Sequence, residues 1–493
     1  MAFREKEMKQ MITRRWFIGG ACAAAAGFRY GALAGDVMGG RPVMKLGVLS
    51  DVHLNRPGDE THFLKALAFF RDNGADGVLI AGDIADTGRV AQLERTAECW
   101  FRTFPNDRAP DGRHVERLFV YGNHDIDAWK WRGMGQYKDD DEKRRTALGF
   151  EDVRARTWER LFHEPFEPVW MKCVKGVRFI GAHWDDRGHC PLIEPFMSAH
   201  AKDIDPALPF FYTQHSHPKD TCYGPAAWGH DDGCSTRALS PFPNAVAFSG
   251  HSHYTLIDER SVWQGAFTSI GTATLRRTSL DYLEPENSNG NPYDPAAKAW
   301  KPKGKKVMKP LFREEGKEGM LIDVHADHLL IRRRNFTFDL PIGDDWTVPI
   351  PAKSDTPFAY AKRAKGRTPP AFAKGAEAKV DVLRDPPPCA REWTKGPFVH
   401  VTFPAAKTAA KCRVFEYEVR ALDGDGKCLL SRRVMAPGFN LPEERCDRPG
   451  ECLFLASELP AGAKVHFEVR ASECFGKKGP AISSREIALD GRA

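Results

Sequence analysis

The sequence has no two cysteines separated by only two residues, although it contains 12 cysteines among 493 residues. Structural zinc sites built from thiolates use such closely spaced pairs. The lack of a pair therefore argues against a thiolate zinc site. With 42% hydrophobic and 28% charged residues, the composition is that of an ordinary globular protein. A chain of this length exceeds one hydrophobic core, so two or three domains are expected.

Long apolar runs and a strong charge imbalance are also missing. The apolar run from Ile18 to Phe28 has about 11 residues, well short of the roughly 20 that span a bilayer. The net charge is +6, but residues 1–34 alone contain six basic and two acidic residues, which leaves +2 for the rest. Because residues 35–493 are nearly neutral, the sequence gives no strong signal for nucleic-acid binding.

The N-terminal segment has the pattern of a targeting signal. Arg14 and Arg15 precede the apolar run, and Ala32-Leu33-Ala34 offers a small-residue cleavage site. This pattern resembles a bacterial twin-arginine export signal, so we expect residues 1–34 to be removed and the mature protein to be periplasmic or on the cell surface, without a transmembrane anchor. An uncleaved N-terminal anchor and a chance pair of arginines are the alternatives. An oxidising compartment permits disulfides, and Cys222 with Cys234 is one possible pair.

From Met44 onward, apolar runs alternate with segments of helical periodicity. We expect strands at 45–50, 77–81, 118–121, 177–182, 209–214 and 245–249, and helices at 60–73, 90–101 and 146–162. Such alternation predicts an α/β domain with a substantially parallel sheet covered by helices. We assign residues 35–350 to this domain. After residue 250 the pattern changes to successive strands at 261–275 and 319–338.

The C-terminal third has a different composition. Residues 351–388 are rich in proline, alanine and lysine, which is typical of a linker. Residues 389–493 contain six short alternating segments, as in a small β-sandwich. The stretch 459–471, in which Val465, Phe467 and Val469 alternate with polar residues, resembles the last strand pair of a fibronectin type III domain.

Four short clusters of metal-type ligands follow predicted strands in a fixed order. Ligands at the ends of several strands of an α/β sheet converge on one crevice. The clusters are Asp51-Val-His53, Gly82-Asp83-Ile-Ala-Asp86, Gly122-Asn123-His124-Asp125 and Gly250-His251-Ser-His253. Each cluster is weak alone, but four in order form a strong signal. The glycines mark sharp strand exits, where a side chain would crowd the site or strain the backbone.

With these motifs, residues 44–340 resemble the calcineurin-like metallophosphoesterases. The resemblance implies two stacked mixed β-sheets flanked by helices, around a pair of divalent or trivalent ions. Asp83 would bridge the ions. Asp51, His53 and His253 would complete the protein ligands of the first ion, and Asn123, His251 and one further histidine those of the second. Imidazole and carboxylate together suit iron, zinc or manganese.

The further histidine is ambiguous in the sequence. The strand ending at Gln214 leads into His215-Ser216-His217-Pro218, whereas relatives commonly have the ligand histidine two residues before the proline. This chain has Ser216 at that position. We favour His215, the first residue after the strand, over His217.

The resemblance also implies a reaction, the hydrolysis of a phosphomonoester or phosphodiester by metal-bound hydroxide. His124 would be the general acid, and Asp86 would hold the His124 ring. The ligand pattern does not distinguish monoesters from diesters, and nothing in it predicts an oligomeric state. Two alternatives stay open, an extracellular nuclease or nucleotidase of the same fold and a surface binding protein whose metal centre is only structural.

Overall fold

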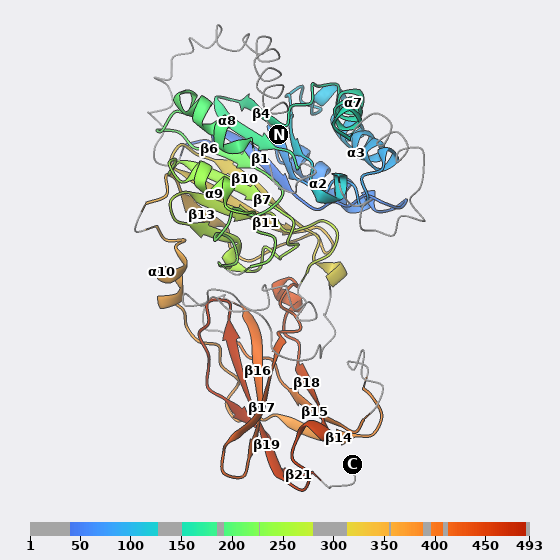
Figure 1. Cartoon of the computed structure of the whole chain (residues 1–493), viewed down its shortest axis with the longest axis vertical. Coiled ribbons are helices and arrows are strands. Elements are labelled where there is room, and N and C mark those ends of the chain that lie inside the picture. Colours follow the sequence, from blue (N-terminus) through green and yellow to red (C-terminus); the bar gives the residue numbers. More distant parts are fainter. Residues whose placement is uncertain are drawn as a thin grey trace, which may run out of the picture. The chain divides into compact units, whose positions relative to one another are not determined.

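The computed structural model describes residues 40–126, 150–184, 192–225, 227–279, 313–353, 356–387, 396–407 and 413–489 (Figure 1). The predicted export signal at residues 1–34 lies outside them. Among the described helices, none has both the length and the apolar character needed to cross a bilayer.

The first sheet carries the first three ligand clusters. Its strands β1 (Met44–Leu49), β2 (Gly77–Ala81) and β3 (Glu116–Val120) are parallel and adjacent. On the other side of β1 the sheet continues with antiparallel strands, which makes it mixed. These strands are β10 (Glu318–Val324), β11 (His328–Asn335), β12 (Leu340–Pro341) and β13 (Trp346–Pro349).

The second sheet carries the remaining ligands. Strands β5 (Val177–Ala182), β6 (Phe210–Thr213), β7 (Ala245–Ser249) and β9 (Thr268–Gly271) are parallel neighbours in that order. Antiparallel strands β4 (Val169–Val174) and β8 (Val262–Gln264) close the two edges. Both sheets are therefore mixed, as the family resemblance implied.

Alternation along the strands explains how the layers form. In β2, Leu79 and Ala81 belong to the core between the sheets, whereas Val78 and Ile80 belong to a separate core under helices. This two-residue period buries both faces of the sheet. The helices on the first sheet are α2 (Glu60–Asp72), α3 (Val90–Thr103) and α7 (Phe150–Phe162), and those on the second are α8 (Ile193–His200) and α9 (Cys234–Leu239). The predicted fold class is confirmed.

The predicted linker at 351–388 contains regular structure. It includes helix α10 (Tyr360–Lys365) and strand β14 (Lys379–Leu383), and β14 pairs with the first strand of the C-terminal sandwich. The proline-rich flanks conceal the short alternating segment of β14 in the sequence. Cys222 and Cys234, the disulfide pair left open above, are both free thiols.

The C-terminal region is an all-β sandwich. One sheet has the order β14-β15-β18, and the other has β17-β16-β19 continued by β20, with β21 also pairing with β19. The predicted alternation in β19 is present, with Val465, Phe467 and Val469 fully buried. The remaining bounds are β15 (Phe398–Phe403), β16 (Val414–Asp423), β17 (Cys428–Met435), β18 (Gly450–Leu455), β19 (Lys464–Glu473), β20 (Ile482–Ser483) and β21 (Ile487–Ala488).

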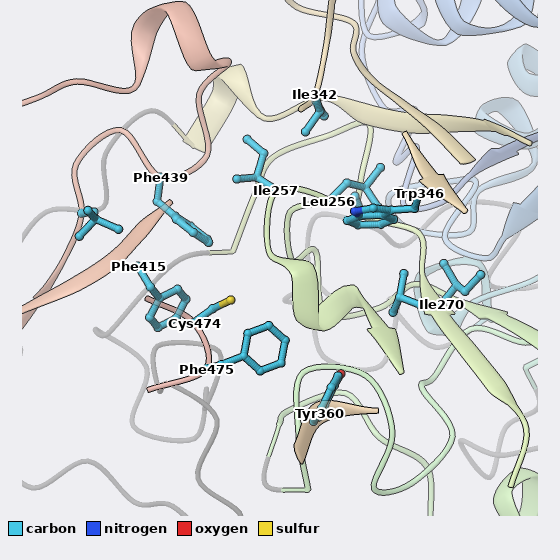
Figure 2. Close-up of a cluster of buried hydrophobic side chains, with 14 of the residues drawn as sticks. Leu256, Ile257, Ile270, Ile342, Trp346, Tyr360, Phe415, Phe439, Cys474 and Phe475 are labelled. Carbon is cyan, nitrogen blue, oxygen red and sulfur yellow. The ribbon is translucent and has the colours of Figure 1, made fainter. Parts of the chain in front are cut away.

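A buried cluster joins this sandwich to the α/β region. Figure 2 shows Phe415 and Phe475, from the sandwich, in the same cluster as Leu256 and Tyr360. The guanidinium of Arg260, which is 1% exposed, lies 4.6 Å from the centre of the Phe415 ring. Arg260 is paired with Asp258 beside it, so the buried charge is compensated. The two regions therefore share one apolar core.

Because Phe415 is fully buried at this junction, we expect Phe415→Ala to lower the free energy of unfolding by about 3–5 kcal/mol. Val382 on β14 is 44% exposed, so Val382→Ala should change it by less than about 0.5 kcal/mol. Calorimetry of both variants measures the difference. A loss below about 1 kcal/mol for Phe415→Ala would contradict the shared core.

A buried carboxyl near the junction gives a second prediction. Glu318 is fully buried and accepts hydrogen bonds from the Thr255 hydroxyl and the Leu256 amide, and burial raises its pKa to about 7. A carboxyl whose pKa is raised on folding stabilises the fold when neutral. That stabilisation is present below its ordinary pKa and is lost as pH rises toward 7. Each unit of pKa shift corresponds to about 1.4 kcal/mol. We therefore expect the free energy of unfolding of Glu318→Gln, relative to that of wild type, to rise by about 3 kcal/mol between pH 4.5 and pH 8.

Denaturant unfolding at a series of pH values tests this, with the exposed Glu98→Gln on α3 as the control. A stability difference between wild type and Glu318→Gln that does not depend on pH would show that the Glu318 carboxyl does not titrate differently on folding.

Candidate metal centre

All four sequence clusters stand at the carboxyl ends of parallel strands. Asp51 and His53 follow β1, Asp83 and Asp86 follow β2, and His251 and His253 follow β7. Asn123 and His124 begin the short helix α4 (Asn123–Ile126) just after β3, and His215 follows β6. Since the two sheets pack face to face, the ends of five strands bring these side chains together.

The backbone is strained where the predicted ligands stand. Asp51, His53, Asp83, His251 and His253 all have positive φ angles, between 51° and 70°. A residue with a side chain in this region costs of order 1–3 kcal/mol, and such residues cluster at functional sites. The surrounding structure therefore holds these five residues in conformations that they do not adopt spontaneously.

Two glycines allow the close approach of the clusters. A Cβ at Gly82 would collide with the His215 ring, and Gly82 also has a φ of 88°. A Cβ at Gly250 would collide with Ser50 and with the carboxylate of Asp51. The glycines predicted at strand exits are thus required mainly because neighbouring ligand side chains occupy the space.

The first group of ligand atoms surrounds Asp51. Its Oδ1 atom lies 3.0 Å from Nε2 of His253 and 3.8 Å from Nε2 of His53. The two histidine Nε2 atoms are 3.1 Å apart. Ligand atoms of Asp51, His53, Asp83 and His253 all lie within 4.8 Å of one another, which is a suitable size for one cation.

The second group includes Asp83 again. Its Oδ2 atom lies 3.1 Å from Nε2 of His215, and that nitrogen lies 3.1 Å from Nδ1 of His251. Ligand atoms of Asp83, His215 and His251 also lie within 4.8 Å of one another. Asp83 is the member that both groups share, which is the position of a bridging carboxylate.

The two carboxylates are charged despite their burial. Burial alone would raise the pKa of Asp51, but the imidazoles around it, His253 above all, hold that pKa well below its ordinary value. The pKa of Asp83 is likewise lowered against the effect of burial, chiefly by His215. Both side chains therefore present anionic oxygens at neutral pH.

The histidines respond in the opposite sense. Burial would lower the pKa of His53, but hydrogen bonds and charge from Asp51, Asp86 and Asp83 raise it to about 9. Asp83 and Asp51 similarly raise the pKa of His215 to about 9. In the metal-free protein these imidazoles carry protons that compensate the carboxylates. Cations that bind here replace those protons.

Further observations show that the residues fit a pair of cations. Oδ1 of Asn123 is buried and accepts no hydrogen bond within the described structure. Buried oxygens of this kind require a partner, which a cation provides. His215 and His253 donate Nδ1–H to the carbonyls of Ala81 and Arg277, at 2.7 and 3.0 Å. Their Nε2 atoms are therefore free of a proton when neutral and directed into the site.

The structure separates the two candidate histidines after β6. His217 is 1% exposed, and its two ring nitrogens lie 2.7 Å from the Ser249 hydroxyl and 2.8 Å from the Ser252 hydroxyl. Neither nitrogen is left for a cation. His215 stands in the second ligand group, in the position favoured from the sequence.

The predicted link between Asp86 and His124 runs through the main chain. Nδ1 of His124 donates to the backbone carbonyl of Asp86 at 2.7 Å, whereas the Asp86 carboxylate is 3.9 Å from that nitrogen. The carboxylate lies closer to Nδ1 of His53, at 3.3 Å. Asp86 therefore orients two rings, one with its carbonyl and the other with its side chain.

Sequence reasoning missed several supporting residues. The buried carboxylate of Asp125 accepts hydrogen bonds from the amides of Ile84, Ala85 and Gly122, so it ties the second cluster to the third. Its position in the Gly-Asn-His-Asp motif was the available signal. Asn55 donates to Asp86 at 3.0 Å, a contact that no sequence pattern indicated.

Two further histidines, His183 and His230, make hydrogen bonds and packing contacts outside the ligand groups. His183 is buried, accepts a hydrogen bond from the Tyr121 amide at 3.0 Å and packs on the rings of Trp158 and Phe166. His230 donates to the carbonyl of Cys222 at 2.9 Å. Neither belongs to a ligand group among the described residues.

The family comparison agrees with this geometry. Residues 44–254 match the sequence model of the calcineurin-like phosphoesterase family. This segment is a calcineurin-like phosphoesterase domain. The two mixed sheets and their flanking helices are the calcineurin-like fold, and all nine predicted site residues lie within the matched segment. No curated protein matches the chain.

Solved structures of similar fold share little sequence with this chain. A dimetal phosphatase from Danio rerio is 10% identical, with 62% of this chain and 98% of that chain covered and a TM-score of 0.35. The purple acid phosphatase PPD1 from yellow lupin (Lupinus luteus) is 14% identical, with 62% and 53% covered and a TM-score of 0.37. GAP50 of Plasmodium is 11% identical, with 63% and 89% covered and a TM-score of 0.35.

Because Asp83 belongs to both ligand groups, we expect Asp83→Asn to reduce the bound metal from two ions per chain to one or none. Asp76 lies just before the other end of β2, where it accepts a hydrogen bond from the Lys45 amide, so Asp76→Asn should keep both ions. Elemental analysis after saturation with manganese or zinc measures the content. Two ions retained by Asp83→Asn would contradict the bridging role.

Proposed function

We propose that this chain is an exported, two-metal phosphoesterase that hydrolyses a phosphomonoester or phosphodiester. The observation that carries the proposal is the sharing of Asp83 by two adjacent groups of mostly buried ligand residues. A shared carboxylate is what holds two cations close enough to act on one phosphoryl group. The match of residues 44–254 to the phosphoesterase family supports the same reaction class.

The donor set indicates which cations belong here. Imidazole and carboxylate ligands suit iron, zinc or manganese better than calcium or magnesium, which prefer oxygen alone. Two such ions would activate a water molecule and neutralise charge that develops on the phosphoryl oxygens. The carbonyl oxygen of Asn123 would add a neutral ligand, which would leave its ion more electron-deficient than another carboxylate would.

His124 is the residue that we assign as general acid. Its Nδ1 is engaged by the Asp86 carbonyl, so Nε2 is the nitrogen that exchanges a proton. Nε2 lies 4.0 Å from Oδ2 of Asp83, and the side chain is 14% exposed, so it borders the site and remains reachable. From there His124 donates a proton to the oxygen of the departing alcohol.

The proposal extends to export and to the C-terminal domain. Export is supported by the paired arginines and apolar run of residues 1–34. A fibronectin type III-like assignment of the C-terminal sandwich is supported by its three-stranded sheet packed against a sheet that contains β17, β16 and β19. Export of a folded, metal-loaded enzyme suits a site whose ligands come from five separate strands.

The activity is tested with purified mature protein supplied with manganese or zinc. We expect hydrolysis of p-nitrophenyl phosphate, bis(p-nitrophenyl) phosphate or both, and loss of that hydrolysis in Asp83→Asn. Absence of turnover of both substrates by protein that contains two ions would refute the enzyme assignment and favour a binding protein.

The acid role of His124 predicts a dependence on the leaving group. His124→Ala should lower kcat for an alkyl phosphate by about 10²–10⁴-fold, because an alkoxide needs a proton to depart. The loss should be much smaller for p-nitrophenyl phosphate, whose phenolate departs unprotonated. Steady-state kinetics on both substrates measures the difference, and equal losses would assign His124 to positioning or charge stabilisation.

A further inference from the structure

One aromatic residue at the metal centre is exposed where aromatic residues are usually buried. Trp228 is 40% exposed, whereas Trp100, Trp158, Trp170 and Trp346 are all at most 8% exposed. Its indole stacks on the imidazole of His251, with ring centres 4.5 Å apart and an angle of 22° between the planes. The indole therefore contacts a member of the second ligand group while much of its own surface faces solvent.

The segment that carries Trp228 is held firmly in place. The amide of His217 donates to the carbonyl of Gly229 at 2.8 Å, and the amide of Asp231 donates to the carbonyl of His217 at 2.8 Å. The Asp231 carboxylate in turn accepts hydrogen bonds from Gln214 at 2.9 Å and from the Gly233 amide at 2.8 Å. These hydrogen bonds tie the residues that follow Trp228 to the segment after β6.

Positioning of His251 alone does not account for this arrangement. The His251 amide already donates to Oδ2 of Asp51 at 3.1 Å, and its ring also faces Trp184, with ring centres 5.6 Å apart. Stacking on His251 uses one face of the Trp228 indole. An indole that is 40% exposed gives up part of the stabilisation that full burial would provide, and this exposed surface lies beside a ligand group, where a planar ring can stack on it.

We propose that Trp228 determines substrate specificity by stacking a planar ring of the substrate on its exposed indole surface. The substrate class is then a phosphate ester that carries an aromatic group, either a nucleobase or an aryl ring. This inference rests on the proposed phosphoesterase function. Because the indole contacts His251, a ring joined to a phosphoryl group at the centre needs only a short linkage to reach it. Stacking of this kind changes affinity by about tenfold.

Two substitutions separate stacking from simple packing. Trp228→Leu keeps an apolar cover on His251 but removes the aromatic face, whereas Trp228→Phe keeps a smaller ring. The probes are phenylphosphonate and methylphosphonate, which are not hydrolysed, together with adenosine 5′-monophosphate and glycerol 3-phosphate as substrates. Inhibition constants, KM and kcat are measured, and the metal content of each variant is determined in parallel.

For Trp228→Leu we expect about tenfold weaker binding of phenylphosphonate, a similar rise in KM for adenosine 5′-monophosphate, or both. The affinity for methylphosphonate and the KM for glycerol 3-phosphate should change less than twofold, and Trp228→Phe should stay close to wild type. If only the KM for adenosine 5′-monophosphate rises, the ring that stacks on Trp228 is a nucleobase. If only the inhibition constant of phenylphosphonate rises, the ring is an aryl group. Either result supports stacking of a substrate ring on Trp228.

If Trp228→Leu weakens the binding of aromatic and non-aromatic ligands equally, or if it loses metal, the proposal is overturned and Trp228 is a positioning residue for His251. Unchanged constants for all ligands would overturn it as well. These outcomes differ from failure of the proposed function, in which metal-loaded wild-type protein hydrolyses no ester and binds neither phosphonate.

Discussion

The structure depends on placing two buried carboxylates, Asp51 and Asp83, among imidazole rings where the ends of two packed sheets meet. Like charges at such short range in a buried site are strongly unfavourable unless positive charge is supplied. The imidazoles of His53 and His215 supply it as protons in the metal-free protein, which is why their pKa values rise to about 9. Cations supply it more effectively. The positive φ angles and close-packed glycines at the strand ends are consequences of this convergence.

Much of this arrangement could be predicted from the sequence because its signals are local. An apolar run followed by Asp-x-His or Gly-Asp marks a strand end and its ligands together, and the core alternation of β19 was equally visible. Elements such as β4, α8 and α9 were missed, since β4 has no regular alternation of buried and exposed residues and α9 has only six residues. The choice between His215 and His217 needed the structure, because only the contacts with Ser249 and Ser252 show that His217 is already engaged.

Contacts between distant segments were beyond the reach of sequence reasoning. The carbonyl of Asp86, not its carboxylate, holds His124, and a main-chain partner leaves no trace in residue identity. The stacking of Trp228 on His251 joins two loops whose meeting depends on the packing of β6 and β7. The shared core around Arg260 and Phe415 likewise depends on how the sandwich meets the α/β region. These features are contacts between residues far apart in the sequence, which no local pattern encodes.

The central claim is that one carboxylate joins two cations at this site. A crystal structure of the metal-loaded protein, with anomalous diffraction recorded at the absorption edge of the added metal, tests it most directly. The account predicts two anomalous peaks about 3.5–4 Å apart, with Asp83 in contact with both. A single peak, or two peaks that share no ligand, would contradict it.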